Sequence, residues 1–195
     1  MATPARTRYT PNSLLRVAVE VFNERGYDGT SMEHLARAAG ITKSSIYHHV
    51  RGKEELLGLA LDRATGALFG VLDEPAATTG PAVDRLRHVL HRAPDVLVAE
   101  LPYVNLLLRA RGNTDTERWA LHRRREFDQR IAALVTAAAA EGDLRADIDP
   151  HLVTKLLFGM VNSITEWYRA DHDTDWSEQL GATVATIAFD GLRRG

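Results

Sequence analysis

The sequence of 195 residues predicts an all-α protein. Apolar residues recur every three or four positions along most of the chain, which is the spacing of one face of an α-helix. Residues that start and stop helices separate these stretches, and no segment alternates apolar and polar residues as a half-buried strand does. We therefore expect short helices at the N-terminus, longer helices after them, and no sheet.

The first expected helix has clear ends. Thr10 is a suitable N-cap and is followed by proline at the first helical position, while Gly26 stops the helix. Leu15, Ala18 and Phe22 form its apolar face.

The second and third expected helices are short. Thr30 and Glu33 have the spacing of a capping box, and Gly40 ends the helix that they open. The apolar stripe of this helix consists of Met32, Leu35, Ala36 and Ala39. Thr42 is the expected N-cap of the third helix, which is anchored by Ile46 and Val50.

Longer helices follow. A fourth helix is expected from Lys53 to about Leu72, and residues 74–81, rich in proline, glycine and threonine, are expected to form a loop. The later helices are expected at 82–93, 95–111, 115–141, 149–170 and 175–193, with Pro102 kinking or splitting the second of these. The domains are expected to comprise residues 1–52 and 53–195.

Composition and charge narrow the functional classes. The chain has no cysteine, so it has neither disulfides nor thiolate metal ligands, which fits the reducing cytoplasm. Apolar runs such as 137–140 are far shorter than the ~20 residues of a membrane span. Residues 1–55 carry eight Lys/Arg and six Asp/Glu, against 16 and 20 in the remainder. This asymmetry indicates a polyanionic partner for the N-terminal third alone.

The third expected helix has an unusual polar face. If Ile46 and Val50 are buried, the opposite side of ITKSSIYHHVRGK carries hydrogen-bonding side chains, namely Ser44, Ser45, Tyr47 and His48. Two short helices joined by a glycine turn have the outline of a helix-turn-helix, whose second helix enters the DNA major groove. The same pattern also fits a solvated corner of an unrelated helical protein, so the pattern alone leaves both interpretations open.

Side chains suited to a DNA backbone surround this face. They are hydrogen-bond donors (Tyr47, His48 and His49), cations near helix starts (Lys43 and Lys53) and threonines at expected helix N-termini (Thr30 and Thr42). Free amides and the helix dipole favour a phosphate at such termini.

From Leu14 to Leu57 the chain resembles the DNA-binding domain of the TetR family of transcriptional regulators. The resemblance is carried by FNERGYDGTS, MEHLARAAGI, TKSSIYHHV and GKEELL. It implies an N-terminal helix-turn-helix DNA-binding domain and a C-terminal helical ligand-binding and dimerisation domain. It also implies a repressor that a small hydrophobic or acyl-CoA effector releases from a double-stranded DNA operator.

The resemblance also implies roles for individual residues. Base-edge or close groove contacts are expected from Lys43, Ser44, Ser45 and Tyr47, and phosphate contacts from Thr30, Thr42, His48, His49 and Lys53. Arg6 and Arg8 precede the first helix, where a chain can form a minor-groove arm or an ordinary tail. Val50 replaces the phenylalanine usual in the family and Gly52 replaces a small polar cap, so we expect slightly weaker anchoring of the third helix.

A homodimer is expected, because one helix-turn-helix contacts too little DNA for specificity. In the 149–170 helix, Gly159 and Ser163 form a path of small residues beside an apolar stripe of Val153, Leu156, Leu157, Met160, Ile164 and Tyr168. The last helix has its own stripe of Leu180, Val184, Ile187 and Ala188. The family typically pairs these two helices as a four-helix bundle, although such stripes are equally typical of an internal core.

The family holds its inducer among the middle helices. The residues expected to line a mostly apolar pocket are Tyr103, Asn105, Arg109, Trp119, Phe127, Asn162, Glu166 and Trp167. The segment LLFGMVNSITEWYR is similar to a subgroup whose effectors are CoA thioesters. Cations at Arg109, Arg111 and 122–125 can meet the phosphates of such an effector, but they also fit a solvated helix face.

The sequence lacks the usual signatures of an enzyme. It has no glycine-rich phosphate loop, no HExxH and no nucleophile elbow. His48 and His49 are adjacent and point in different directions from a helix, which is poor metal-ligand geometry. We expect no enzyme activity, no cofactor and no metal. The competing interpretations are a helical ligand carrier or enzyme without sequence-specific DNA binding, and a family-like protein that binds ligand without reading DNA.

Overall fold

The computed structural model describes residues 11–169, 176 and 179–192, so the predicted arm at Arg6 and Arg8 lies outside the described residues. Within the described part, every regular element is a helix, as predicted. The helices are α1 (Pro11–Arg25), α2 (Met32–Ala39), α3 (Lys43–Tyr47), α4 (Lys53–Leu72), α5 (Pro75–Thr78), α6 (Ala82–Ala99), α7 (Leu101–Arg109), α8 (Asp115–Glu141), α9 (Pro150–Trp167) and α11 (Leu180–Phe189).

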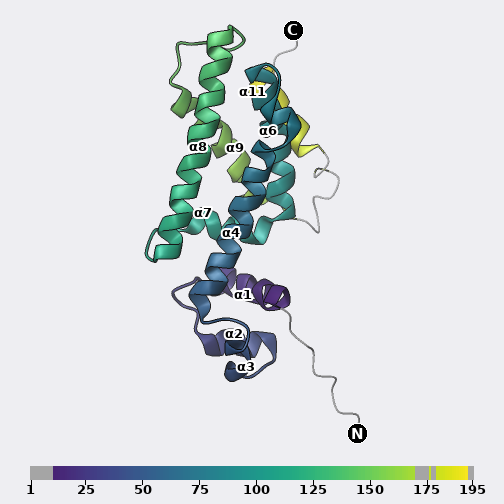
Figure 1. Cartoon of the computed structure of the whole chain (residues 1–195). Helices are drawn as coiled ribbons and strands as arrows, with labels where there is room; N and C mark the ends of the chain where they lie inside the picture. The colour runs from purple at the N-terminus through teal and green to yellow at the C-terminus, as the bar shows by residue number, and fades with distance from the viewer. Residues whose placement is uncertain (1–10, 170–175, 177–178, 193–195) are drawn as a thin grey trace.

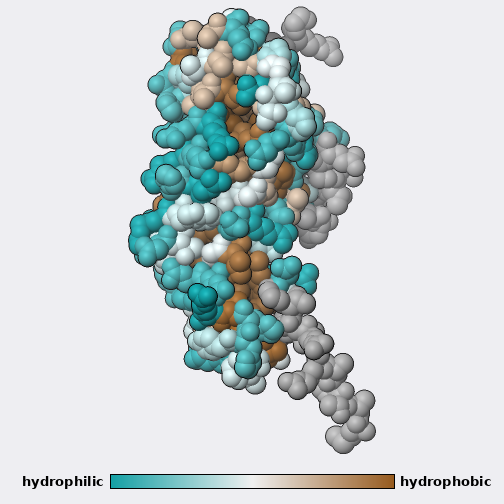
Figure 2. Space-filling model, in the orientation of Figure 1, coloured by the Kyte–Doolittle hydropathy of each residue, from teal (hydrophilic) through white to brown (hydrophobic). Residues whose placement is uncertain are grey.

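The molecule is elongated, with α1, α2 and α3 at one end (Figure 1). Helix α4 leads from these three helices into a larger bundle that contains α6, α8, α9 and α11. Hydrophilic residues cover most of the face in Figure 2, and hydrophobic residues are visible in strips between them. The amphipathic helices therefore turn most of their apolar residues inward.

The N-terminal helices pack around the residues that the periodicity predicted. Phe22, Leu35 and Ile46 are fully buried, and Val50 is buried beside them. Thr42 is the N-cap of α3, as predicted, and its side chain accepts a hydrogen bond from the Ser45 amide. These anchors fix which face of α3 points outward.

The predicted capping box at Thr30 and Glu33 is wrong, because α2 begins one residue later than expected. Ser31 is the N-cap, and its Oγ accepts a hydrogen bond from the His34 amide at 3.2 Å. His34 Nδ1 in turn accepts from the Ser31 amide at 3.2 Å. Histidine replaces the glutamate or glutamine that usually completes this motif.

The two departures at Val50 and Gly52 have different structural outcomes. Val50 is buried against the same core as Ile46, so a smaller side chain still anchors the end of α3. Gly52 is the N-cap of α4 and offers no side-chain cap. Glu55 in the first turn instead holds the residue before the N-cap, since its Oε2 accepts a hydrogen bond from the Arg51 amide at 2.6 Å.

The C-terminal helices differ from the predicted ranges at their ends. Pro94 was expected to separate two helices, but α6 continues through it to Ala99. Pro94 is buried in that helix, and packing outweighs the hydrogen bond that proline cannot make. The break falls at Glu100, and Pro102 lies in the first turn of α7. The expected loop contains the short helix α5.

Helix α11 lies directly against α6. A Cβ atom on Gly181 would lie 2.0 Å from the carbonyl oxygen of His91 in α6. Such a distance is impossible without movement of the backbone, so glycine is what allows the two helices to approach.

Helix α4 contributes to two hydrophobic cores. Leu56, Leu57 and Leu61 belong to the core of the N-terminal helices, whereas Phe69 and Leu72 belong to the core of the large bundle. Helix α7 also contributes to the N-terminal core, through residues such as Leu106. The two halves of the molecule are therefore joined by shared packing. None of the helices in the described residues has the combined length and apolar character that crossing a membrane requires.

Candidate nucleic-acid interface and ligand cavity

Helix α3 lies at one end of the molecule (Figure 1). The helix and its flanks carry a cluster of polar side chains. The Thr42 hydroxyl lies 3.0 Å from the Ser44 hydroxyl and 2.8 Å from the Ser45 hydroxyl. Tyr47 is a large side chain that is 49% exposed. The exposed members of the predicted set are Thr42, Lys43, Ser44, Tyr47, His48 and His49, and Ser45 is half-buried.

Lys43 is engaged with an acidic neighbour. Its Nζ donates to Glu33 Oε1, and both side chains are about half exposed. The pair connects α3 with α2. The hydrogen bond to Lys43 holds the pKa of the Glu33 carboxyl below its usual value, so Glu33 is charged at neutral pH. A phosphate that approaches Lys43 must therefore compete with this carboxylate.

Lys53 has a structural role that the sequence did not indicate. Its Nζ donates hydrogen bonds to the carbonyl oxygens of Tyr27 and Thr30, each at 2.9 Å. The same ammonium group lies 4.3 Å from the centre of the Tyr27 ring. Lys53 thus ties the start of α4 to the segment between α1 and α2, and one of its three N–H groups is not used by these two bonds.

Thr30 does not present its side chain to solvent. The residue is only 2% exposed, and its hydroxyl donates to the Gly26 carbonyl at 2.7 Å. The hydroxyl therefore stabilises the turn after α1, and the capping function expected of it belongs to Ser31. As it stands, the Thr30 side chain is not placed to contact a phosphate.

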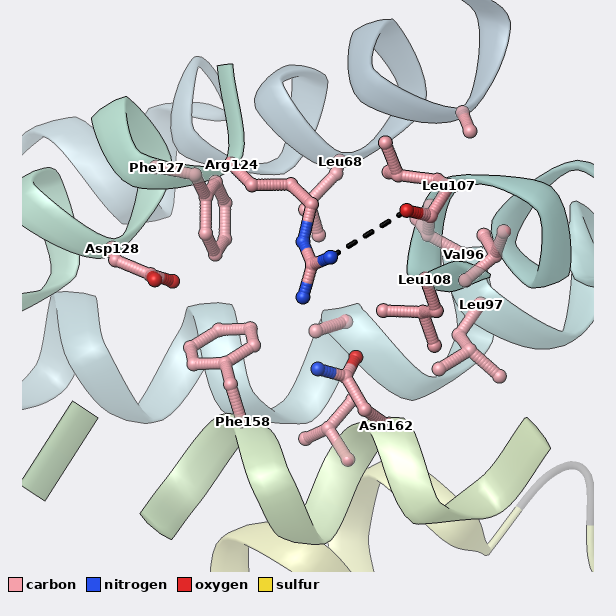
Figure 3. A pocket seen from close by; sticks show the side chains of 14 residues that line it. Leu68, Val96, Leu97, Leu107, Leu108, Arg124, Phe127, Asp128, Phe158 and Asn162 are labelled. Carbon is pink, nitrogen blue, oxygen red and sulfur yellow. Dashed lines mark hydrogen bonds between the residues drawn. The ribbon is translucent and has the colours of Figure 1, made fainter. Parts of the chain in front are cut away.

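A cavity lies between α4, α6, α7, α8 and α9 and has a volume of about 60 Å³. Its lining is mostly aliphatic and aromatic, as Figure 3 shows. The lining residues are Ala64, Leu68, Ala93, Val96, Leu97, Val104, Leu107, Leu108, Arg124, Phe127, Asp128, Phe158, Val161 and Asn162.

Two of the eight predicted ligand residues, Phe127 and Asn162, line this cavity. Asn105, Arg109 and Glu166 line a more polar groove between α7 and α9, which also includes Asn162. The groove and the cavity share Leu108 and Asn162, so they adjoin each other.

The other three predicted residues lie elsewhere and do not line this cavity. Tyr103 turns toward α1 and α4, where the Arg63 guanidinium lies over its ring at 4.3 Å. Trp119 is exposed on the outer side of α8. Trp167 is exposed near the end of α9, and its ring packs edge-on against Tyr168 and Trp176.

Arg124 and Asp128 are the charged residues among the cavity residues that the sequence did not predict. Arg124 was considered only as one of four successive cations, and a helix turns such a run around its axis by about 100° per residue. Arg124 lies four residues after the buried Ala120 and three residues before the buried Phe127, and Ile131 continues the same stripe. This helical spacing places Arg124 on the buried face of the helix, and it is the signal that would have singled this residue out.

The cavity gives Asp128 an unusual environment. Burial raises the pKa of its carboxyl group, and nearby Arg124, Lys155 and His151 act in the opposite direction with smaller effect. The charged form of Asp128 is therefore disfavoured in the folded protein.

Helix α7 connects the cavity to α1. Val104, Leu107 and Leu108 on α7 line the cavity. Asn23 at the end of α1 donates from Nδ2 to the Pro102 carbonyl at 2.8 Å, and Arg109 donates back to the Asn23 carbonyl at 3.1 Å. Hydrogen bonds at both ends of α7 thus tie this helix to α1.

Two family models match the chain. The model described as "Bacterial regulatory proteins, tetR family" matches residues 14–60, and "Tetracyclin repressor-like, C-terminal domain" matches residues 79–192. The chain belongs to the TetR family. It is a DNA-binding transcriptional regulator with the ligand-binding C-terminal domain of that family, and not an enzyme.

Solved structures and curated relatives agree with this assignment. The crystal structure of SCO3833, a TetR-family regulator from Streptomyces coelicolor A3, is 60% identical, with a TM-score of 0.89 over 99% of this chain and 96% of that chain. The repressor KstR2 of Mycolicibacterium smegmatis is 24% identical over 97% of this chain and 94% of its own length. AibR, crystallised with isovaleryl coenzyme A and operator DNA, shares the fold, with 23% identity and a TM-score of 0.78 over 92% of this chain and 97% of that chain.

This TetR-family chain also has an apolar surface on α9. Leu156 is 65% exposed and Leu152 is 50% exposed, on the same helix as the exposed small residues Gly159 and Ser163. Ile187 on α11 is exposed as well. The predicted stripes are thus divided, because Ile164, Tyr168, Leu180 and Val184 are buried in the bundle core.

Proposed function

We propose that this TetR-family regulator is a homodimeric repressor that acts in the cytoplasm, binds its operator through α3 and is released when a small effector fills the cavity. The observation that carries this proposal is that α4 and α7 line the cavity and also contribute to the core of the DNA-binding helices. Occupancy of the cavity and the position of α3 therefore depend on the same two helices.

The exposed side of α3 is suited to a DNA groove. Its short hydroxyl side chains allow the helix to approach base edges closely, and Tyr47 reaches further. In this proposal Lys43, Ser44, Ser45 and Tyr47 contact base edges, while Thr42, His48 and His49 contact phosphates. Lys53 mainly positions the segment between α1 and α2, and its remaining N–H reaches a phosphate.

The apolar residues exposed on α9 and α11 supply the dimer surface. Large exposed leucines beside Gly159 allow two copies of α9 to approach and to bury Leu152 and Leu156. A symmetric pair places two copies of α3 at a fixed separation, which is what two half-sites require.

The small size of the cavity explains how an effector acts. Pockets that hold small-molecule ligands typically measure about 300–1,000 Å³, whereas this cavity measures about 60 Å³. An effector therefore has to separate the lining helices, and displacement of α7 or α4 changes the position of the DNA-binding helices. The effector shifts this equilibrium only by as much as it prefers the open form.

The arrangement of cavity and groove favours a two-part effector, a short acyl thioester of CoA. A short acyl group suits the apolar lining of the cavity once the helices separate, and the longer polar part extends past Leu108 and Asn162 into the groove that contains Arg109. The complex of AibR with isovaleryl coenzyme A supports this class of effector, because AibR has the same fold.

A binding experiment tests the proposal. The purified protein is titrated, by fluorescence anisotropy, against a labelled duplex from the DNA upstream of its own gene and against a shuffled duplex. We expect tight binding to the first duplex only, and release upon addition of a short acyl-CoA but not of free CoA. Equal binding to both duplexes would refute operator recognition, and release by none of the acyl-CoAs would refute the thioester class.

A further inference from the structure

Among the described residues, Arg124 is the one charged donor in the cavity lining, and it has few groups to bind. Figure 3 shows its guanidinium in the middle of the cavity, between the aromatic rings of Phe127 and Phe158 on one side and Leu108 on the other. Its hydrogen bond to the Leu107 carbonyl is 3.5 Å long, at the limit of a hydrogen bond. Across residues 11–169, 176 and 179–192, no ion pair involves Arg124.

Other arginines of α8 are engaged differently. Arg118 pairs with Asp115, and Arg123 and Arg130 both pair with Glu126. Arg124 alone among these turns inward to the cavity. Since a guanidinium stays charged in proteins, the cavity holds a permanent positive charge whose five N–H donors are mostly unused.

Asp128 does not supply the missing partner. It lines the same cavity, but Figure 3 shows it on the far side of Phe127 from Arg124. Burial raises the pKa of the Asp128 carboxyl, so its negative charge is disfavoured there. A cation in a mostly apolar space is costly when no anion forms an ion pair with it, unless a partner arrives.

We propose that the part of the effector inside the cavity carries a carboxylate, which pairs with Arg124 while its carbon chain packs against Leu68, Phe127 and Phe158. The planar guanidinium matches a carboxylate in bidentate geometry. This inference rests on the proposed function, since it assumes that the cavity is the effector site. The carboxylate belongs either to a short free acid or to the far end of the acyl group of a dicarboxylic CoA thioester.

The anion also provides a link to α7. Arg124 donates to the carbonyl of Leu107 at 3.5 Å, so a carboxylate that draws the guanidinium toward itself breaks this long hydrogen bond to α7. The helix that contacts α1 through Pro102 and Arg109 loses one of its restraints at the moment when the effector binds.

Matched ligands test the carboxylate. Glutaryl-CoA and pentanoyl-CoA differ only in ending with a carboxylate or a methyl group, and pentanoate serves as the free acid. Calorimetry gives their dissociation constants, and anisotropy with the operator duplex gives release. We expect glutaryl-CoA or pentanoate to bind at least about tenfold more tightly than pentanoyl-CoA. A tenfold change in the dissociation constant corresponds to the smallest contribution that a hydrogen bond to a charged group usually makes. A preference for glutaryl-CoA assigns the carboxylate to the thioester, and binding of pentanoate alone assigns it to a free acid.

Variants of one helix assign the effect to the residue. Arg124→Met should abolish the preference for the carboxylate, Arg124→Lys should keep part of it, and Arg130→Met, which removes a surface charge of α8, should keep all of it. Operator binding without ligand and the melting temperature verify that each variant is folded. Asp128→Asn should tighten carboxylate binding, whereas a cationic effector would bind this variant more weakly.

Two results would overturn the inference. One is that the wild type binds pentanoyl-CoA as tightly as the two carboxylates or more tightly, and that Arg124→Met binds all three as the wild type does. If pentanoyl-CoA still released the operator, the proposed function would remain intact. The other is that none of the three probes binds. Operator binding measured in the absence of ligand decides separately whether the proposed DNA-binding function holds.

Discussion

At the scale of single residues, the structure gives Lys53 two possible effects on DNA binding. Its ammonium group holds the carbonyls of Tyr27 and Thr30, so it shapes the segment that leads into α2. Its charge also lies near the surface that we assign to DNA. The two effects differ in what they change, because only the charge contributes to the dependence of binding on salt.

Lys53→Ala should lower both stability and DNA affinity. Loss of two hydrogen bonds from a charged donor should reduce the free energy of unfolding by about 1–3 kcal/mol. Affinity should fall for all DNA sequences, and the slope of log K against log salt should decrease by about one. Thermal melts and anisotropy titrations at several salt concentrations measure these effects. A lower melting temperature with an unchanged salt slope would show that Lys53 is structural only.

Glu33→Gln should strengthen DNA binding. The substitution removes the carboxylate that engages Lys43 at the exposed surface, so the ammonium group becomes available to DNA. Affinity should rise a few-fold at low salt, and the difference from wild type should shrink as salt increases. Asp115→Asn, which removes an exposed carboxylate from α8, serves as the control. Equal affinities of Glu33→Gln and wild type would contradict a contact between Lys43 and DNA.

At the scale of the helix, α8 combines two tasks in its inward face. Phe127 and Ile131 are fully buried in the bundle core, whereas Arg124 and Asp128 turn polar groups into the cavity. When the pKa of a buried carboxyl group is raised by folding, ionisation of that group lowers the free energy of unfolding. The polar groups of α8 that face the cavity therefore lower the stability of the folded protein, and they do not contribute to the packing of the core.

Asp128→Asn should stabilise the protein in a pH-dependent way. The pKa of Asp128 is raised above its usual value of 3.8 in the folded state, so the folded state binds more protons and loses stability as pH rises through the window above 3.8. The amide lacks this penalty. We expect the melting temperature of the variant to exceed that of wild type by a few degrees at pH 7, since ~1 kcal/mol corresponds to about 2–4 °C at this chain length. The gain should vanish near pH 3.8, and a constant gain across pH would contradict it.

At the scale of the whole molecule, function depends on two copies of a chain whose DNA-binding and ligand-binding parts share α4 and α7. The cavity is close to these helices, and the exposed part of α9 is the surface on which two copies can meet. In the mechanism that we propose, dimerisation sets the distance between two α3 helices, and the effector changes it.

Leu156→Glu should separate the dimer without unfolding the chain. Leu156 is largely exposed in the single chain, so the substitution is tolerated there, but a carboxylate buried in a dimer interface is unpaired. The dissociation constant of the dimer should rise on the order of 100-fold or more, with loss of operator binding. Light scattering and gel shifts measure these quantities. Leu59→Glu, at an exposed leucine of α4, is the control, and an intact dimer with Leu156→Glu would place the interface elsewhere.

Local sequence patterns predict the helical fold, the buried anchors of α3 and the polar residues that α3 exposes. All of these follow from local spacing and caps, as with Ile46, Val50 and Thr42, because neighbours along one helix fix which side is apolar. Local patterns also determined most helix ends. They failed at Thr30, where a neighbouring serine caps α2 instead, and at Pro94, where burial keeps α6 continuous.

Only the tertiary structure decided which residues of the C-terminal helices face the cavity. Phe127 and Asn162 line it, while Trp119 and Trp167 do not, although all four are aromatic or polar residues on the expected helices. The physical reason is that a cavity is bounded by five helices at once, and its lining depends on their relative rotation and distance. Those quantities are set by packing between residues far apart in the sequence, and the inward direction of Arg124 is their most consequential result.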